Sequence, residues 1–145
     1  MPGPLSLDPV PIGSAQVVRE GTGVSLLTYS VGVHQGLEAA EQLAGEGISV
    51  EVVDLRSLVP LDIATIAASV NKTSRAVVLH EDARRLGYGA EIAATVQEEC
   101  FWRLDGPVVR VAGKNTPIPT SPALEDAAVP QLPEIVSTLR QVATA

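Results

Sequence analysis

Residues 48–79 read ISVEVVDLRSLVPLDIATIAASVNKTSRAVVL, a run in which two apolar segments flank a segment of helical periodicity. Ile48–Leu55 is rich in β-branched residues, which is typical of a strand buried on both faces. Asp62 is a preferred N-cap residue, and the apolar residues after it have helical spacing: Ile63, Ile66, Ala67 and Val70. Ala76–Leu79 is a second short apolar strand. This order predicts two parallel strands joined by a right-handed crossover.

The same alternation of strand and helix continues on both sides of this unit. Upstream, Val24–Tyr29 predicts a strand, and a helical apolar face follows it at Val33, Leu37, Ala40 and Ala44. Downstream, Pro107–Val111 predicts a strand between two further helices. Their apolar faces are Ile92, Ala93, Val96 and Cys100 in the first, and Leu132, Ile135, Val136, Leu139 and Val142 in the second. The predicted fold class is therefore α/β, a three-layer α/β/α sandwich around a mostly parallel sheet.

One further strand is expected at the start of the domain. Gln16–Arg19 has a strand pattern that breaks at the turn signal Gly21-Thr22-Gly23. Because a tight turn joins it to the next strand, we expect this segment to pair antiparallel at one edge of the sheet.

Composition narrows the classes of protein and partner. The chain has 145 residues, 46% of them apolar, which fits a single domain. Its 10 basic and 17 acidic residues give a net charge of -7, so nucleic acid and membrane surfaces are poor partners. The single cysteine, Cys100, forms no internal disulfide, and we expect a cytoplasmic protein. Residues 1–13, rich in proline and glycine, predict a linker or leader before a domain over residues 14–145.

Polar side chains follow the carboxyl ends of the predicted parallel strands. Sheets of this kind have their functional sites at that edge. The polar side chains are Tyr29, Ser30, His34, Asp54, Arg56, His80, Glu81, Asp82, Arg84, Arg85, Lys114 and Asn115. None of these residues belongs to a complete zinc-binding or dinucleotide-binding motif. His80-Glu81 lacks the second histidine of a zinc helix, and Gly87-Tyr88-Gly89 lacks the third glycine of a dinucleotide loop.

Cys100 lies on an apolar helix face, so we interpret it as a buried inert thiol. We expect no catalytic, cofactor-binding or metal-binding residue in this chain, and loop solvation alone also explains these polar side chains.

One constellation supports an alternative function. Asp54, Glu81, Asp82 and Lys114 all end predicted strands, and receiver domains use acids and a lysine in this way around a phospho-accepting aspartate and magnesium. Asp54 would be the acceptor. Receivers, however, place their acidic pair after the first strand, where this chain has Tyr29-Ser30. A receiver or ligand-binding domain therefore stays open as the second hypothesis.

Longer stretches resemble a known family. The runs IGSAQVVREGTGVSLLTYS, VEVVDLRSLVPLDIATIAASVNKTSRAVVLHED, GYGAEIAATVQEECF, LDGPVVRVAG, NTPIP and ALEDAAVP follow one another in the chain. In order and spacing they resemble the transketolase-type C-terminal domain of the beta subunit of thiamine-diphosphate-dependent 2-oxoacid dehydrogenases. TVQEECF is most similar to the branched-chain, 2-oxoisovalerate type, and PALEDAAVP to the pyruvate and acetoin types.

The resemblance implies that this domain binds partner proteins rather than carrying a catalytic site. In the family, thiamine diphosphate and magnesium lie between the alpha subunit and the preceding, N-terminal domain of the beta subunit. The domain resembled here helps to hold beta subunits together and docks the subunit-binding domain of the dihydrolipoyl acyltransferase. The resemblance thus implies that the domain associates with these partners. We expect the isolated domain to be inactive, because the chain has no convincing nucleophile and no diphosphate-magnesium ligands. We also expect a homodimer, because the chain is rich in Val, Ile, Leu and Ala and exposed apolar surface tends to pair with a second copy.

The same resemblance points to docking residues. Asp105 in LDGP matches an acidic residue that the family uses against its basic acyltransferase partner. A role as a turn former before Gly106-Pro107 explains Asp105 equally well. We expect Glu125 and Asp126 to support Asp105 on one acidic surface, and we add His80, Glu81 and Arg84 as further interface candidates.

Overall fold

The computed structural model describes residues 9–145, and within them the strands form one five-stranded sheet. Its strands are β1 (Gln16–Arg19), β2 (Val24–Thr28), β3 (Val50–Asp54), β4 (Ala76–Ala83) and β5 (Val109–Gly113). The order across the sheet is β1-β3-β2-β4-β5. Strands β2 to β5 are parallel, and β1 runs antiparallel at the edge. The predicted α/β sandwich with one antiparallel edge strand is confirmed.

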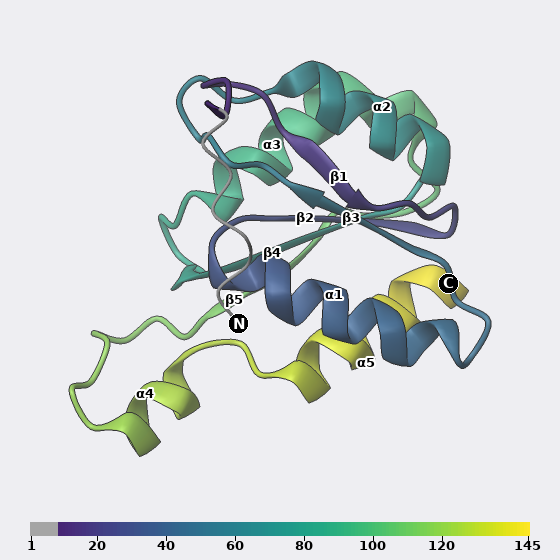
Figure 1. Ribbon diagram of the computed structural model, residues 1–145. Coiled ribbons are helices and arrows are strands. Elements are labelled where there is room, and N and C mark those ends of the chain that lie inside the picture. Colours follow the sequence, from purple (N-terminus) through teal and green to yellow (C-terminus); the bar gives the residue numbers. More distant parts are fainter. Residues whose placement is uncertain (1–8) are drawn as a thin grey trace.

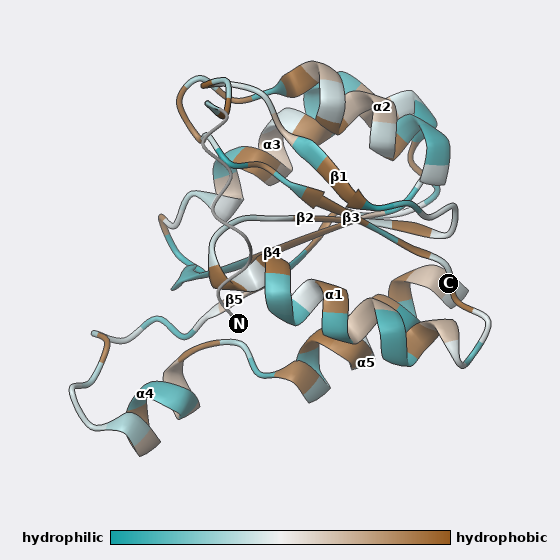
Figure 2. Ribbon diagram, in the orientation of Figure 1, coloured by the Kyte–Doolittle hydropathy of each residue, from teal (hydrophilic) through white to brown (hydrophobic). Residues whose placement is uncertain are grey.

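Helices cover both faces of the sheet, as Figure 1 shows with the sheet nearly edge-on. Helices α1 (Val31–Ala44) and α5 (Leu132–Thr144) cover one face; α2 (Ile63–Thr73) and α3 (Gly89–Cys100) cover the other. A 3-10 turn, η1 (Phe101–Arg103), follows α3, and the short α4 (Pro122–Ala128) projects from the body. Each face has its own apolar core, so the strands in Figure 2 are hydrophobic along most of their length. None of the helices in the described residues has the length and apolar character to cross a membrane.

The predicted cap of α2 is present. Asp62 accepts hydrogen bonds from the Thr65 backbone N–H at 3.0 Å and from the Thr65 hydroxyl at 2.7 Å. It also accepts one from the Ala15 N–H at 2.9 Å, which ties the chain before β1 to this helix. These hydrogen bonds, with those from Thr65 first, hold the pKa of Asp62 below its ordinary value. The cap therefore keeps its charge, and its stabilising effect, in mildly acidic solution.

Some elements differ from the sequence expectation. Strand β1 pairs with β3, not with β2, which follows β1 directly in the chain. The turn between β1 and β2 lies across the start of β3, because the Gly23 N–H donates to the Ser49 carbonyl at 2.8 Å. Helix α4 was not expected, because its segment stands in a proline-rich stretch; Pro122 occupies its first turn, where a missing N–H costs nothing. Strand β5 begins at Val109, two residues later than expected.

The expected leader, residues 1–13, falls mostly on residues 1–8, which lie outside the described residues. Its boundary with the domain stays a prediction.

Candidate docking site

The structure separates the acidic residues that were expected to share one surface. The Asp105 N–H donates to the carbonyl of Ser74 at 2.9 Å, just before β4 begins, so Asp105 lies at the amino edge of the parallel strands. Glu125 and Asp126 belong to α4, which follows the carboxyl end of β5 and bonds there through Lys114 N–H and Ala128 carbonyl. The expectation that Glu125 and Asp126 support Asp105 is therefore corrected: they lie at opposite edges of the sheet.

Asp105 lines a cavity of about 200 Å³ at the amino edge. The cavity is mainly apolar, with walls from the start of β5 and the end of α5: Gly106, Pro107, Val109, Gln141, Val142 and Ala145. Arg75 closes one side, where its guanidinium donates to the Ala145 carbonyl at 3.0 Å. The same guanidinium forms a long ion pair with the Asp105 carboxylate at 4.0 Å, beyond hydrogen-bond distance. The side chain of Asp105 is 60% exposed, so its oxygens remain accessible to donors from a partner.

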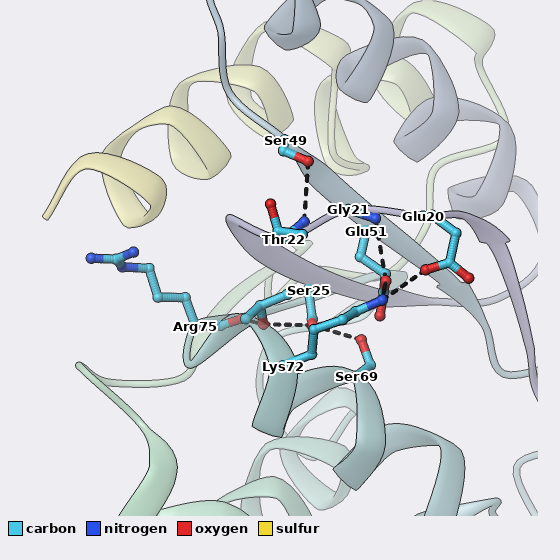
Figure 3. Close-up of polar contacts among 10 residues, drawn as sticks. Glu20, Gly21, Thr22, Ser25, Ser49, Glu51, Ser69, Lys72 and Arg75 are labelled. Atoms are coloured by element: carbon cyan, nitrogen blue, oxygen red, sulfur yellow. Dashed lines mark hydrogen bonds and ion pairs between the residues drawn. The ribbon is translucent and has the colours of Figure 1, made fainter.

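A buried polar network fixes the backbone that carries Arg75. Ser74 ends α2 in the left-handed conformation (φ 59°), which turns the chain into β4. The carbonyl of Arg75 then accepts from the Ser25 N–H at 2.9 Å and from the Thr73 hydroxyl at 3.0 Å. The Ser25 hydroxyl in turn contacts Ser69 and Thr73 at 2.6 and 2.8 Å. Figure 3 shows this chain of contacts running from the sheet to Arg75.

A separate polar cluster contains a buried carboxylate that the sequence analysis did not single out. Glu51 of β3 is fully buried, and its carboxylate pairs with the ammonium of Lys72 and accepts from the Gly21 N–H at 3.2 Å. Lys72 also reaches Glu20 at 2.7 Å, and the hydrogen bond to Glu20, followed by that to Glu51, raises the pKa of Lys72. A charged residue in the middle of the doubly buried run Ile48–Leu55 was the available signal, because such a charge requires a partner.

His80 cannot serve as an interface residue, contrary to the sequence expectation. The residue is only 1% exposed, and a Cβ on Gly89, the first residue of α3, would stand 2.1 Å from its Nε2. Neither ring nitrogen has a hydrogen-bond partner. Burial therefore lowers the pKa of His80; the charge of Arg110 acts in the same direction, and that of Asp82 opposes it. His80 is a core residue.

This burial gives a pH dependence. Because the folded-state pKa of His80 lies below the ordinary value of 6.5, the unfolded chain binds more protons once the pH falls below that value. We expect the free energy of unfolding contributed by His80 to be complete at pH 7.5 and to decline as the pH drops from about 6.5 to 5. Urea denaturation at pH 7.5 and 5.0 measures the change, with His34→Gln, at an exposed site, as the control. An equal decline in His80→Leu would contradict the assignment.

The other two interface candidates of that group lie at the carboxyl edge. Glu81 is half-buried in β4, and Arg84 is exposed just after that strand. The guanidinium of Arg84 donates to the Arg110 carbonyl at 2.9 Å, and that of Arg110 donates to the Arg84 carbonyl at 2.7 Å. Arg84 thus links the end of β4 to β5, and its side chain remains accessible to a partner.

The receiver hypothesis requires a metal centre beside Asp54. Asp54 ends β3 half-buried, where its carboxylate accepts from the Arg56 N–H at 3.1 Å and lies 3.8 Å from the Arg56 guanidinium. Among residues 9–145, no three His, Cys, Asp or Glu side chains stand close enough to hold a metal ion. Cys100 is buried, and burial raises the pKa of its thiol, which keeps it protonated and unreactive.

The comparisons with known proteins agree on one protein family. A model described as "Transketolase, C-terminal domain" matches residues 13–135. The chain is 52% identical over 127 residues to the mitochondrial pyruvate dehydrogenase E1 component subunit beta-1 of Arabidopsis thaliana, spanning 88% of this chain and 35% of that protein. It is 44% identical to the corresponding subunit beta of Bacillus subtilis, over 92% of this chain and 41% of that one.

Further relatives extend beyond the pyruvate enzymes. The chain is 42% identical to the beta subunit of an acetoin:2,6-dichlorophenolindophenol oxidoreductase of Cupriavidus necator, over 91% of this chain and 39% of that one. Among solved structures, a split-gene transketolase described as an inactive beta4 tetramer has a TM-score of 0.82 at 28% identity, over 99% of this chain and 46% of that one. The chain thus spans less than half the length of these relatives.

Proposed function

Because the chain belongs to the family of transketolase C-terminal domains, we propose that it acts in a thiamine-diphosphate-dependent 2-oxoacid dehydrogenase as the association domain of the beta subunit. The relatives that carry this proposal are beta subunits of pyruvate dehydrogenase E1, at 44–52% identity over about nine-tenths of the chain. Such an enzyme oxidatively decarboxylates a 2-oxoacid and transfers the acyl group to a lipoyl group.

The cofactor belongs to other parts of that enzyme. Thiamine diphosphate supplies the carbanion chemistry of decarboxylation, and magnesium anchors its diphosphate. On this proposal both lie between the alpha subunit and the N-terminal domain of the beta subunit. The described residues offer no carboxylate cluster for the metal, and the buried Glu51 is engaged by Lys72 and Gly21. We propose that this chain contributes to the enzyme by binding partners.

The observation that carries the docking role is an exposed carboxylate beside an apolar cavity. Asp105 keeps its oxygens open, and Pro107, Val109 and Val142 offer apolar surface next to it. A basic partner with apolar flanks fits such a site, because the ion pair orients the encounter and apolar burial stabilises the complex. The partner we propose is the subunit-binding domain of a dihydrolipoyl acyltransferase.

Asp105→Ala tests this role. We expect about tenfold weaker binding of the subunit-binding domain at low ionic strength, mainly through slower association, and a smaller difference in 0.5 M salt. Surface plasmon resonance gives both rates. The matched control is Asp126→Ala, an exposed acid at the opposite edge, which should bind as the unchanged chain does. Equal affinities for Asp105→Ala and the unchanged chain at both salt concentrations would remove the docking role.

Self-association is the second part of the proposal. Large apolar side chains are exposed in the segments at the carboxyl edge, where Glu81 and Arg84 also lie: Ile12, Val31, Val59 and Leu86. Apolar surface of this kind marks contacts with other subunits or domains, and homo-oligomers bury it symmetrically. We propose a homodimer, and sedimentation equilibrium checks it: a monomer at all concentrations would exclude the dimer.

The substrate class is a 2-oxoacid. The relatives named above favour pyruvate or acetoin, whereas TVQEECF alone favours the branched-chain type. Assays of the complete enzyme with pyruvate and with 2-oxoisovalerate decide between them.

A further inference from the structure

The most exposed aromatic side chain of the protein stands beside the proposed docking site. Trp102, the only tryptophan in the sequence, is 92% exposed in η1, and Phe101 before it is 53% exposed. An indole carries a large apolar area, so leaving two adjacent aromatic residues in water is costly unless a partner covers them.

The two rings are held in a defined arrangement. Their centroids lie 4.9 Å apart and the planes cross at 83°, the edge-to-face geometry that aromatic pairs favour. The backbone beneath is anchored as well, because the Leu104 N–H bonds to the Phe101 carbonyl and the Asp105 N–H to Ser74. Trp102 is therefore presented to a partner on an ordered turn, which lowers the entropy cost of binding.

A second hollow connects the aromatic pair to Asp105. It has a volume of about 450 Å³ and is open to solvent, and it is lined by Gln97, Phe101, Trp102 and residues 104–107. Asp105, Gly106 and Pro107 line both this hollow and the cavity described above. Asp105 therefore borders both the apolar cavity and the hollow that the aromatic pair lines.

The aromatic rings and the carboxylate of this hollow favour a cationic occupant. Asp105 is the charged residue that lines it, and its side chain is 60% exposed. Arg103 follows Trp102 in η1, and Arg75 forms a long ion pair with Asp105 at 4.0 Å while it donates to the Ala145 carbonyl. A tryptophan face attracts a guanidinium or ammonium group, and more strongly where the cation also meets a carboxylate.

We propose that Trp102 is a specificity-determining residue of the docking site. An arginine or lysine side chain of the basic partner lies against the indole of Trp102, while Asp105 pairs with its charge. This inference rests on the proposed docking function and adds an aromatic contact to it.

The experiment uses Trp102 as its own reporter. The subunit-binding domain of the acyltransferase, in a form without tryptophan, is titrated into the chain, and the indole fluorescence is followed. We expect a saturable change in the unchanged chain. The variants have no indole, so isothermal titration calorimetry measures their affinity. We expect it to fall about twofold to threefold in Trp102→Phe and about tenfold in Trp102→Leu, since leucine keeps apolar area but lacks the π-face that attracts a cation. Leu124→Ala, an exposed apolar site on α4, is the control and should leave affinity unchanged.

The outcomes separate the two claims. Equal affinities of Trp102→Phe, Trp102→Leu and the unchanged chain, together with a loss in Asp105→Ala, would overturn the role of Trp102 and leave docking intact. An absence of binding by the unchanged chain would overturn both. A fluorescence change that depends only on the concentration of the chain itself would assign Trp102 to the contact between copies, and would likewise overturn this inference.

Discussion

Gly21→Ala is expected to destabilise the protein by about 3 kcal/mol or more. A Cβ at this position would stand 2.3 Å from the Glu51 nitrogen and 2.3 Å from the Val50 carbonyl carbon. Both are backbone atoms of β3, so the clash is relieved only by moving the turn between β1 and β2 away from the sheet. That movement also breaks the 3.2 Å hydrogen bond from the Gly21 N–H to Glu51. Urea denaturation followed by circular dichroism measures the loss.

Gly106→Ala is the matched control. A Cβ on Gly106 would meet nothing within 4 Å, so the same substitution there should change the free energy of unfolding by no more than about 0.5 kcal/mol. A Gly21→Ala variant as stable as Gly106→Ala would mean that the β1–β2 turn does not lie against β3 as described.

Lys72→Met should cost about 2–3 kcal/mol at pH 7. Methionine keeps the unbranched chain out to Cε but removes the ammonium group that faces Glu51, and Glu51 has no access to water. The carboxylate would keep only the Gly21 N–H as a partner. Lys72 itself is partly exposed, which places the expected cost below that of a fully buried pair.

A double-mutant cycle isolates this interaction. In Lys72→Met/Glu51→Gln the buried group is neutral, and we expect much of the lost stability to return. Lys114→Met, at an exposed lysine after β5, should lie within about 0.5 kcal/mol of the unchanged chain. If Lys72→Met proves as mild as Lys114→Met, the buried ion pair does not stabilise the domain.

The sequence predicted the fold well because its signals are local and repeated. The β-branched run before Asp54, the Asp62 cap and the helical spacing after it all depend on neighbours within a few residues, and the structure confirms each. The partner of β1 could not be predicted in this way, since the contact of Gly23 with Ser49 joins residues far apart in the chain. Helix α4 was missed because its prolines read as loop signals.

The site was less predictable than the fold. Asp105 was identified through family resemblance, but its edge of the sheet depends on the contact with Ser74, which no spacing in the sequence reveals. The same limitation placed His80 on a surface, although its ring lies beneath Gly89. Trp102 did carry a signal, an isolated tryptophan beside a turn, but its exposure depends on the fold that surrounds it.

We propose that this chain binds protein partners and holds no cofactor of its own. Isothermal titration calorimetry tests it directly: thiamine diphosphate with magnesium is titrated first, and the acyltransferase subunit-binding domain is titrated second into the same protein. The account predicts no saturable heat from the cofactor and saturable one-site binding of the partner domain. Saturable micromolar binding of thiamine diphosphate, or no heat from the partner domain, would contradict it.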